Sequence, residues 1–136
     1  MTRWLLKTEP STYAWADLVR AGRAVWDGVR NPAALGHLRG MRPGDEAFIY
    51  HTGGEKAVVG VARVATAAYP DPGAGDPRLV VVDLEPVRAL ASPVTLAAVK
   101  ADPRFAGFAL VRVPRLSVMP VSPELWQDIL DLSRLS

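Results

Sequence analysis

Cysteine is absent from the 136-residue sequence, and histidine occurs only twice. Without cysteine, the chain can form neither a disulfide nor a thiolate metal site. His37 and His51 fall on unrelated predicted elements, so we expect no metal site. The sequence also lacks the run of about 20 apolar residues that a membrane-spanning helix needs, and its first apolar run is too short for a signal peptide. We therefore expect a cytoplasmic protein with no membrane partner, no metal and no cofactor.

A strong excess of one charge is also missing. The 16 basic residues face 14 acidic ones, which leaves a formal net charge of +2. The chain is therefore not a polycation that coats a nucleic-acid backbone. Only Lys7, Lys56 and Lys100 are lysines, and the other basic residues are arginines, which recognise planar groups and stack on bases. Alanine is abundant beside them, which points to a compositional bias of the genome, so we infer no function from the arginine excess.

Known catalytic signatures are absent as well. The sequence has no GxSxG elbow, P-loop, HExxH helix or calcium loop, and no GxGxxG after a predicted strand. Residues 53–56 share only glycines and a lysine with a phosphate loop, and their place between two predicted strands favours a hairpin tip. The adjacent carboxylates Asp45 and Glu46 fall in a turn, where we expect them to be solvated. With 49% hydrophobic and 22% charged residues, the sequence is typical of one globular domain, 1–136.

The apolar pattern predicts about six short strands and four short helices. The strands are expected at 4–8, 47–51, 57–65, 79–84, 109–113 and 116–121. The helices are expected from Ser11 or Thr12 to Gly22, at 32–39, at 95–101 and from Pro123 onward. Crossover helices of proper length for a parallel sheet are missing. The pattern therefore predicts an α+β fold, a small, mostly antiparallel β-barrel with short helices packed around it.

Three positions carry predictions about the backbone. Gly60, inside the strand 57–65, indicates a bulge or the close approach of another backbone. The stretch 69–77 holds three prolines and two glycines and is expected to be an exposed loop without regular structure. Pro86 is expected either to end the strand 79–84 or to place it on a sheet edge, because proline has no N–H group to donate.

The segment from Val25 to Pro32 concentrates polar groups and one large aromatic side chain before a helix. Asn31 can cap that helix, and proline at the first helical position loses no hydrogen bond. Exposed N–H groups at such a helix start favour an electron-rich ligand. In a simpler interpretation Trp26 is a core residue and Asp27 and Arg30 form a local ion pair. Taken alone, the segment favours this simpler interpretation.

A second group of polar side chains follows the first predicted strand. Together with Trp26 and its neighbours, it can supply aromatic faces, hydroxyls, carboxylates and an amide to the edge of a planar heterocycle. Stacking of one base on an aromatic side chain is worth about 1–3 kcal/mol. The residues that form this combined group are Lys7, Thr8, Glu9, Ser11, Tyr13, Trp26, Asp27, Arg30 and Asn31.

Four stretches of the sequence resemble the EVE domain family: WLLKTEPS at 4–11, WDGVRN at 26–31, FIYH at 48–51 and RLSVMPV at 115–121. The resemblance covers essentially the whole chain, in the right order. It implies a PUA-like β-barrel and a role in binding nucleic acid that carries a modified base. It also implies kinship with YTH domains, which hold a methylated adenine in an aromatic cage.

Carried over position by position, the resemblance implies that Lys7, Thr8 and Glu9 form one wall of a pocket. Trp26 corresponds to a cage tryptophan, with Asp27 as its polar neighbour. YTH domains bring a second tryptophan from a later loop. Here the remaining candidates, Trp15 and Trp126, fall on predicted helices and look like core residues, and the aromatic residues that could replace the second wall are Tyr13, Tyr50 and Phe48.

The resulting hypothesis is a non-catalytic module that reads a modified base in DNA or RNA. Trp26 is expected to be partly exposed in a cleft formed with Lys7, Thr8, Glu9 and Ser11. To the group named above, the hypothesis adds Tyr50 and His51 at a strand end and Arg115 and Ser117 from the last family motif, whose role is either binding or structural.

Two alternatives remain open. The first is an enzyme that acts on a nucleobase, with Glu9, Asp27 or His51 as acid–base groups. A partly buried, hydrogen-bonded histidine is, however, the commoner state of such a residue. The second alternative is a sensor of a free nucleoside.

Overall fold

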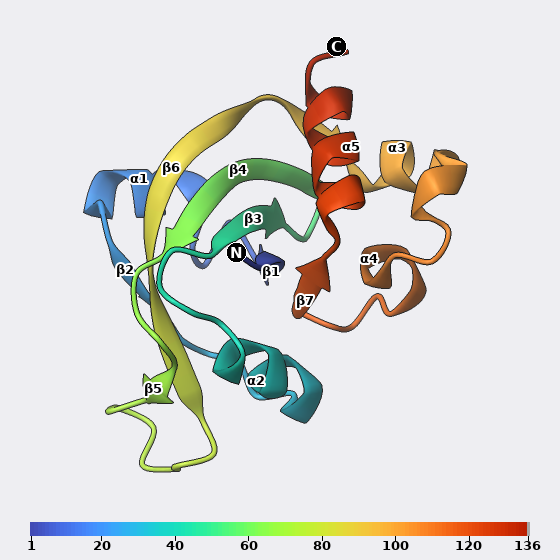
Figure 1. The fold of residues 1–136 in the computed structure, drawn as a ribbon. Helices are drawn as coiled ribbons and strands as arrows, with labels where there is room; N and C mark the ends of the chain where they lie inside the picture. The colour runs from blue at the N-terminus through green and yellow to red at the C-terminus, as the bar shows by residue number, and fades with distance from the viewer. Residues whose placement is uncertain (136) are drawn as a thin grey trace.

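A curled, mixed sheet forms the centre of the computed structural model, which describes residues 1–135 (Figure 1). Within these residues its seven strands are β1 (Arg3–Thr8), β2 (Ala24–Trp26), β3 (Glu46–His51), β4 (Ala57–Val64), β5 (Tyr69–Pro70), β6 (Val80–Thr95) and β7 (Val118–Val121). The strand order is β2-β6-β4-β3-β1-β7, and β5 pairs with β6. Only β1 and β3 run parallel; the other pairs are antiparallel. The predicted α+β, PUA-like architecture is confirmed, with the sheet curled into a half-barrel.

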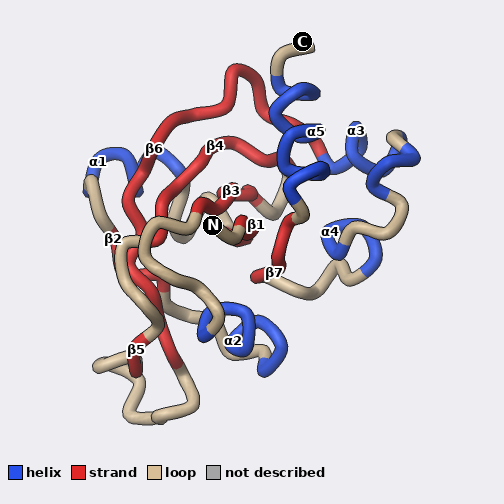
Figure 2. The backbone as a smooth tube through the Cα atoms, viewed as in Figure 1, coloured by secondary structure: helices blue, strands red, loops and turns tan. Residues whose placement is uncertain are grey.

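Short helices surround this sheet (Figure 2). They are α1 (Trp15–Ala21), α2 (Pro32–Arg39), α3 (Leu96–Ala101), α4 (Ala109–Arg112) and α5 (Pro123–Ser133), with a 3₁₀ turn, η1 (Pro103–Phe105). In Figure 1, α1 lies on one side of the sheet, and α3, α4 and α5 gather on the other. No helix within residues 1–135 is long and apolar enough to span a membrane.

Side-chain caps set the starts of three helices where the sequence predicts them. The side chains of Asn31, Thr95 and Ser122 accept hydrogen bonds from N–H groups in the first turns of α2, α3 and α5. The predicted cap of α1 at Ser11 or Thr12 is wrong. The N–H groups of Thr12 and Tyr13 donate to the Glu9 carbonyl in a turn, and the helix begins only at Trp15.

Two strand predictions differ from the structure. Residues 109–113, expected to be a strand, contain the helix α4, because one helical turn buries Phe108 and Leu110 together. An apolar run this short does not distinguish a strand from a helix. The strand expected at 79–84 continues to Thr95. Pro86 lies beyond the part of β6 that pairs with β2, so it occupies an edge position and does not end the strand.

The stretch 69–77 also holds more structure than expected, because Tyr69 and Pro70 pair with Val81 and Val80 as β5. The bulge predicted at Gly60 is confirmed, since the pairing register shifts beside it, and a group from elsewhere in the chain also approaches closely. That group is a side chain rather than a backbone. A Cβ at this position would lie 2.6 Å from the Trp15 ring.

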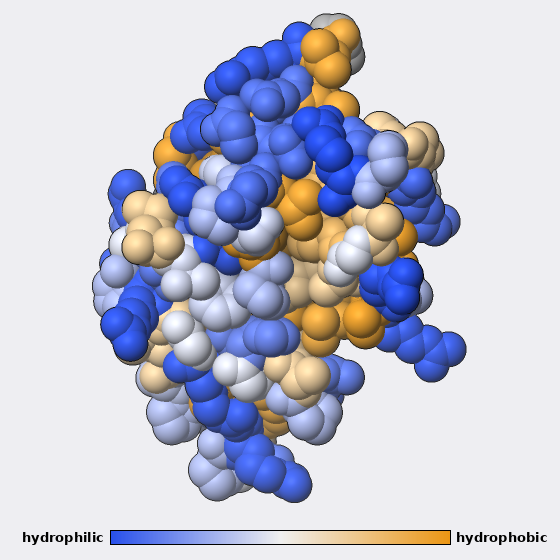
Figure 3. Space-filling model, turned by 45° about the vertical axis from the view of Figure 1, so that its right-hand side comes forward, coloured by the Kyte–Doolittle hydropathy of each residue, from blue (hydrophilic) through white to orange (hydrophobic). Residues whose placement is uncertain are grey.

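The core fills the inside of the curled sheet and includes three of the four tryptophans. Phe48 stacks on Trp126 with ring centroids 3.7 Å apart, which confirms Trp126 as a core residue. Asp45 is not solvated as expected but is only 5% exposed, and its carboxylate accepts a hydrogen bond of 3.0 Å from the Trp4 indole. The face in Figure 3 is mostly hydrophilic around an apolar centre.

Candidate functional site

A hollow of about 460 Å³ opens between the carboxyl end of β1 and the segment that follows β2. Its volume lies within the range of pockets that hold small molecules. Two aromatic side chains, one carboxylate and two threonines face it. The lining residues are Thr8, Thr12, Tyr13, Val25, Trp26, Asp27 and Gly28.

The two aromatic rings of this hollow meet edge to face. The ring centroids of Tyr13 and Trp26 lie 6.1 Å apart, at an interplanar angle of 86°. Burial raises the pKa of the Tyr13 hydroxyl, so it stays a neutral donor at physiological pH. Trp26 is only 7% exposed, so the expected partly exposed ring is wrong: most of it packs in the core and a small part faces the hollow.

A short turn holds Tyr13 against the end of β1. The Thr8 hydroxyl donates a hydrogen bond of 2.6 Å to the Tyr13 carbonyl. The Glu9 carboxylate accepts hydrogen bonds from the Ser11 hydroxyl and the Ser11 N–H group, and these bonds hold the pKa of Glu9 below its usual value. Neither Glu9 nor Ser11 lines the hollow, so they shape the turn that carries Tyr13.

Lys7 lies on the other side of β1 from Thr8, because successive side chains of a strand point to opposite faces. Its Nζ donates a hydrogen bond of 2.8 Å to the Pro114 carbonyl and lies 5.7 Å from the centroid of the Tyr50 ring. Burial lowers the pKa of Lys7. Lys7 and Tyr50 line a separate hollow, so the structure does not bring them to Trp26.

Both ring nitrogens of His51 are engaged by the protein. Nε2 accepts a hydrogen bond of 3.0 Å from the backbone N–H group of Trp15. The ring proton therefore lies on Nδ1, which is 2.7 Å from a Glu55 carboxylate oxygen. His51 is buried and does not line the hollow of Trp26. His51 is thus in the commoner, hydrogen-bonded state, and the structure does not bring this predicted site residue to Trp26.

Asp27 is the one carboxylate that lines the Trp26 hollow within the described chain. It is exposed, and within residues 1–135 it forms neither the local ion pair with Arg30 nor any other. Asn31, in contrast, uses its side chain to cap α2, and it accepts from the N–H groups of Ala33 and Ala34. These amides are therefore occupied, which removes the expected electron-rich-ligand site at this helix start.

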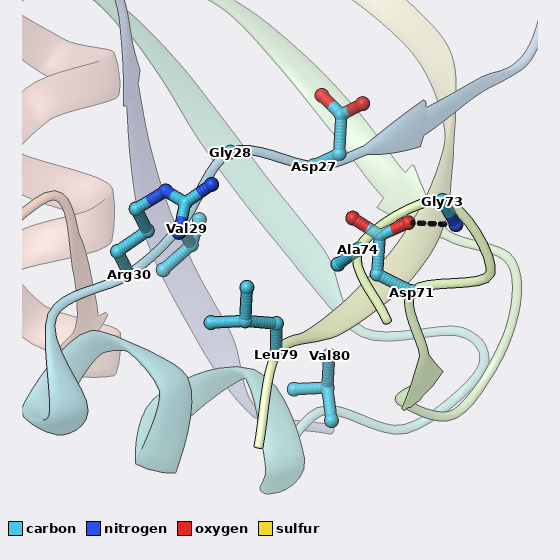
Figure 4. A pocket seen from close by; sticks show the side chains of 9 residues that line it. All are labelled: Asp27, Gly28, Val29, Arg30, Asp71, Gly73, Ala74, Leu79 and Val80. Atoms are coloured by element: carbon cyan, nitrogen blue, oxygen red, sulfur yellow. Dashed lines mark hydrogen bonds between the residues drawn. The ribbon is translucent and has the colours of Figure 1, made fainter. Parts of the chain in front are cut away.

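A second hollow, of about 320 Å³, adjoins the first (Figure 4). Asp27 and Gly28 line both, so they form the ridge between them, and Gly28 has a φ of +79° where the chain turns. Leu79 and Val80 lie on the side of this hollow away from the Asp27 carboxylate (Figure 4). Asp71, which was not among the predicted site residues, reaches this hollow from the stretch 69–77, and long Pro/Gly loops often carry functional residues.

The last two predicted site residues lie away from both hollows. Arg115 is exposed in the turn before β7, and the Ser117 carbonyl accepts a hydrogen bond of 2.9 Å from the Lys7 N–H group. Ser117 thus extends the pairing of β1 with β7, which is a structural contribution. No group of three or more metal-binding side chains occurs in the described part of the chain.

The sequence and the overall fold are similar to those of known proteins. The EVE domain profile matches residues 2–132. Thymocyte nuclear protein 1 of Mus musculus is 30% identical, in an alignment that covers 95% of this chain and 72% of that protein. Rpa0253 from Rhodopseudomonas palustris is 44% identical, with a TM-score of 0.93 and coverage of 99% of this chain and 94% of that one.

A further solved structure contains a ligand. Human THYN1 in complex with 5-methylcytosine containing DNA is 27% identical, with a TM-score of 0.90. The superposition covers 100% of this chain and 99% of that one. Because the family profile matches nearly the whole length of this chain, the chain belongs to the EVE domain family.

Proposed function

We propose that this protein is a single-domain, non-catalytic reader of a modified base in nucleic acid, and that the base enters the hollow between Tyr13 and Trp26. The observation that carries the proposal is the aromatic corner of these two rings in a hollow of about 460 Å³. Stacking of one base on an aromatic side chain is worth about 1–3 kcal/mol, and Tyr13, which is less buried than Trp26, is the ring with more surface available for it. The related human THYN1, solved with 5-methylcytosine containing DNA, supports a methylated cytosine as the first candidate.

Asp27 supports recognition of the edge of such a base. Its carboxylate lines the hollow and is exposed, so it can accept a hydrogen bond from the exocyclic amino group of cytosine. The 5-methyl group adds apolar surface beside Val25 and the aromatic rings. Burial of one such carbon is worth about 0.8 kcal/mol, which corresponds to about a fourfold preference over cytosine.

The arrangement of acid–base groups favours binding over catalysis. His51 is buried with both ring nitrogens engaged, and the Glu9 carboxylate is held by Ser11. Within residues 1–135, Asp27 is thus the one carboxylate at the hollow and no histidine joins it, whereas acid–base catalysis needs groups within hydrogen-bond reach of the same substrate.

Fluorescence anisotropy titrations of short labelled oligonucleotides test the proposal. The strands differ at one base, which carries cytosine, 5-methylcytosine or another modified base, in single-stranded and duplex form. We expect a preference of about fourfold or more for one methylated strand. The free modified nucleoside, used as a competitor, should bind more weakly than the same base in a strand. No preference across the panel would overturn the proposal.

Asp27→Ala provides the matching variant, with Asp131→Ala on the exposed face of α5 as a control of equal charge. Loss of one hydrogen bond to a charged group should lower the affinity for the preferred strand about tenfold. The control should leave affinity unchanged, and both variants should melt near the parent temperature. Equal affinities for the two variants would remove Asp27 from the site.

A further inference from the structure

All three lysines of the chain line one hollow of about 290 Å³. They come from separate elements, because Lys7 lies on β1, Lys56 lies at the tip of the β3–β4 hairpin, and Lys100 lies on α3. Tyr50 and Thr52 also face this hollow, which we call the three-lysine pocket. The other 13 basic residues are arginines, and none of them lines it. The fold thus gathers one type of side chain that is scattered in the sequence.

The positive charge of the three-lysine pocket is not neutralised within the described chain. Seven arginines form ion pairs with carboxylates, but no lysine does within residues 1–135. Two carboxylates lie nearby without forming an ion pair to a lysine: Glu55 contacts His51 and lines an adjoining hollow with Lys56 and Lys100, and Glu9 accepts from Ser11. Three lysines around one hollow give it a positive charge, and this charge attracts an anion.

The backbone at Lys56 gives a second, independent observation. Its φ of +47° makes it the one non-glycine residue with positive φ in residues 1–135. This conformation costs an L-residue about 1–2 kcal/mol, and glycine adopts it freely. The Lys56 carbonyl accepts a hydrogen bond of 2.8 Å from the Leu96 N–H group, which fixes the hairpin tip beside the start of α3. Backbone strain of this kind is found most often at functional positions, which supports a role for the Lys56 side chain.

The pocket lies next to the Tyr13–Trp26 hollow, across the end of β1. Lys7 lines one and Thr8 the other, and the Cα atoms of such neighbours are about 3.8 Å apart. The Thr52 N–H group donates a hydrogen bond of 2.9 Å to the Thr8 carbonyl, so the end of β3 completes the wall between them. A nucleic-acid strand that crosses this wall can place a base on one side and its backbone on the other.

We propose that the three-lysine pocket binds a backbone phosphate of the strand whose base enters the Tyr13–Trp26 hollow. The inference rests on the function proposed above. Such a contact adds affinity without reading sequence, because phosphates carry no base information. For a single strand, each phosphate neutralised contributes about 0.7 to the slope of log affinity against log salt.

The test uses the double variant Lys56→Gly/Lys100→Ala. Glycine relieves the backbone strain at Lys56, and alanine favours the helix at Lys100, so the variant should melt at or near the parent temperature. Its affinity for methylated and unmethylated single strands should fall by the same factor, about tenfold at low salt. The salt slope should decrease by about 0.7 in total, because the one phosphate bound at this pocket is no longer neutralised.

Arg42→Ala/Arg88→Ala is the matched control, because both arginines are exposed and the double variant loses the same charge. Arg42 lies in the turn that precedes β3, at the end away from the three-lysine pocket. We expect the control to keep nearly the parent slope. Equal slopes for the two double variants would overturn the phosphate site, and so would a lysine variant that changes methyl preference alone.

The outcomes separate the two proposals. A protein that shows no methyl preference, but whose slope still depends on Lys56 and Lys100, loses the proposed function and keeps the phosphate site. A protein that keeps its preference and shows no lysine-dependent slope loses the phosphate site only. Inorganic phosphate, titrated as a competitor, completes the test: a pocket that binds it without any effect on oligonucleotide affinity contradicts the proposal.

Discussion

The two ends of the β1–β3 pair treat polar groups in opposite ways. At the amino end, the buried Asp45 carboxylate accepts hydrogen bonds of 3.0–3.1 Å from the Trp4 indole and from the backbone N–H groups of Thr2 and Arg42. At the carboxyl end, the side chains of Thr8 and Lys7 donate to the Tyr13 and Pro114 carbonyls, but they also line two different hollows that hold charged groups without ion-pair partners within residues 1–135.

The difference shows where this fold derives stability and where it leaves groups for a ligand. Polar groups satisfied inside the protein stabilise the native state, whereas a charge without an internal partner is free to bind. Asp27, Lys56 and Lys100 are of the second kind within residues 1–135. Variants at the two ends should therefore separate stability from binding.

Trp26→Ala should have the largest effect of the variants, because it should lower both the stability of the fold and the binding of the modified base. The side chain is only 7% exposed, so its removal should lower the free energy of unfolding by about 3–5 kcal/mol, measured by denaturant unfolding. Trp126→Ala, which removes a core ring away from the hollow, should cost a similar amount. Below both melting temperatures, only the Trp26 variant should lose methyl preference. If it kept that preference, Trp26 would be a core residue alone.

Asp45→Ala should lower the free energy of unfolding by about 2–4 kcal/mol, because three donors lose their acceptor in a buried site. The affinity of the folded variant for oligonucleotides should equal that of the parent, measured by anisotropy well below the melting temperature. Asp131→Ala, at an exposed position, serves as the control for charge. A changed affinity would mean that the amino end also contributes to binding.

The pH dependence of binding should show the smallest effect, in the alkaline range. Burial lowers the pKa of Lys7 below its usual 10.5, so the free protein loses this ammonium earlier than an exposed lysine would. A bound phosphate favours the charged form, so affinity should fall as pH rises through the lowered pKa. Anisotropy titrations between about pH 7.5 and 10 measure this fall, and Lys7→Met should flatten it. An unchanged slope in Lys7→Met would exclude Lys7 from the phosphate contact.

The starts of α2, α3 and α5 were predictable from the sequence because their capping signals are local. Asn31-Pro32 and Ser122-Pro123 each place a capping side chain directly before a proline, and both caps form as expected. The error at 109–113 has the opposite cause. Its residues suit either a strand or a helix. The helix is favoured because it buries the Phe108 and Leu110 side chains together, and no local pattern reveals that burial.

The candidate site was predictable only in part. Trp26, Tyr13, Thr8 and Asp27 were all expected near one another and do line one hollow. Lys7 is separated from them because successive side chains of a strand point to opposite faces. The prediction had placed Lys7, Thr8 and Glu9 on one wall of a single pocket. The proximity of Lys56 to Lys100 depends on tertiary packing of the hairpin tip against α3, so it has no signal in the sequence.

The position of β1 between β3 and β7 has a consequence for the order of folding. Arg3 pairs with both Glu46 and Val121, so the two neighbours of this strand come from distant parts of the chain. Closure of such long loops costs chain entropy before packing compensates for it, which slows folding. During synthesis β1 can pair with β3 early, but its other edge waits for residues 118–121. The strand that carries Thr8 and Lys7 is thus completed late, and until then its open edge is exposed to pairing with other chains.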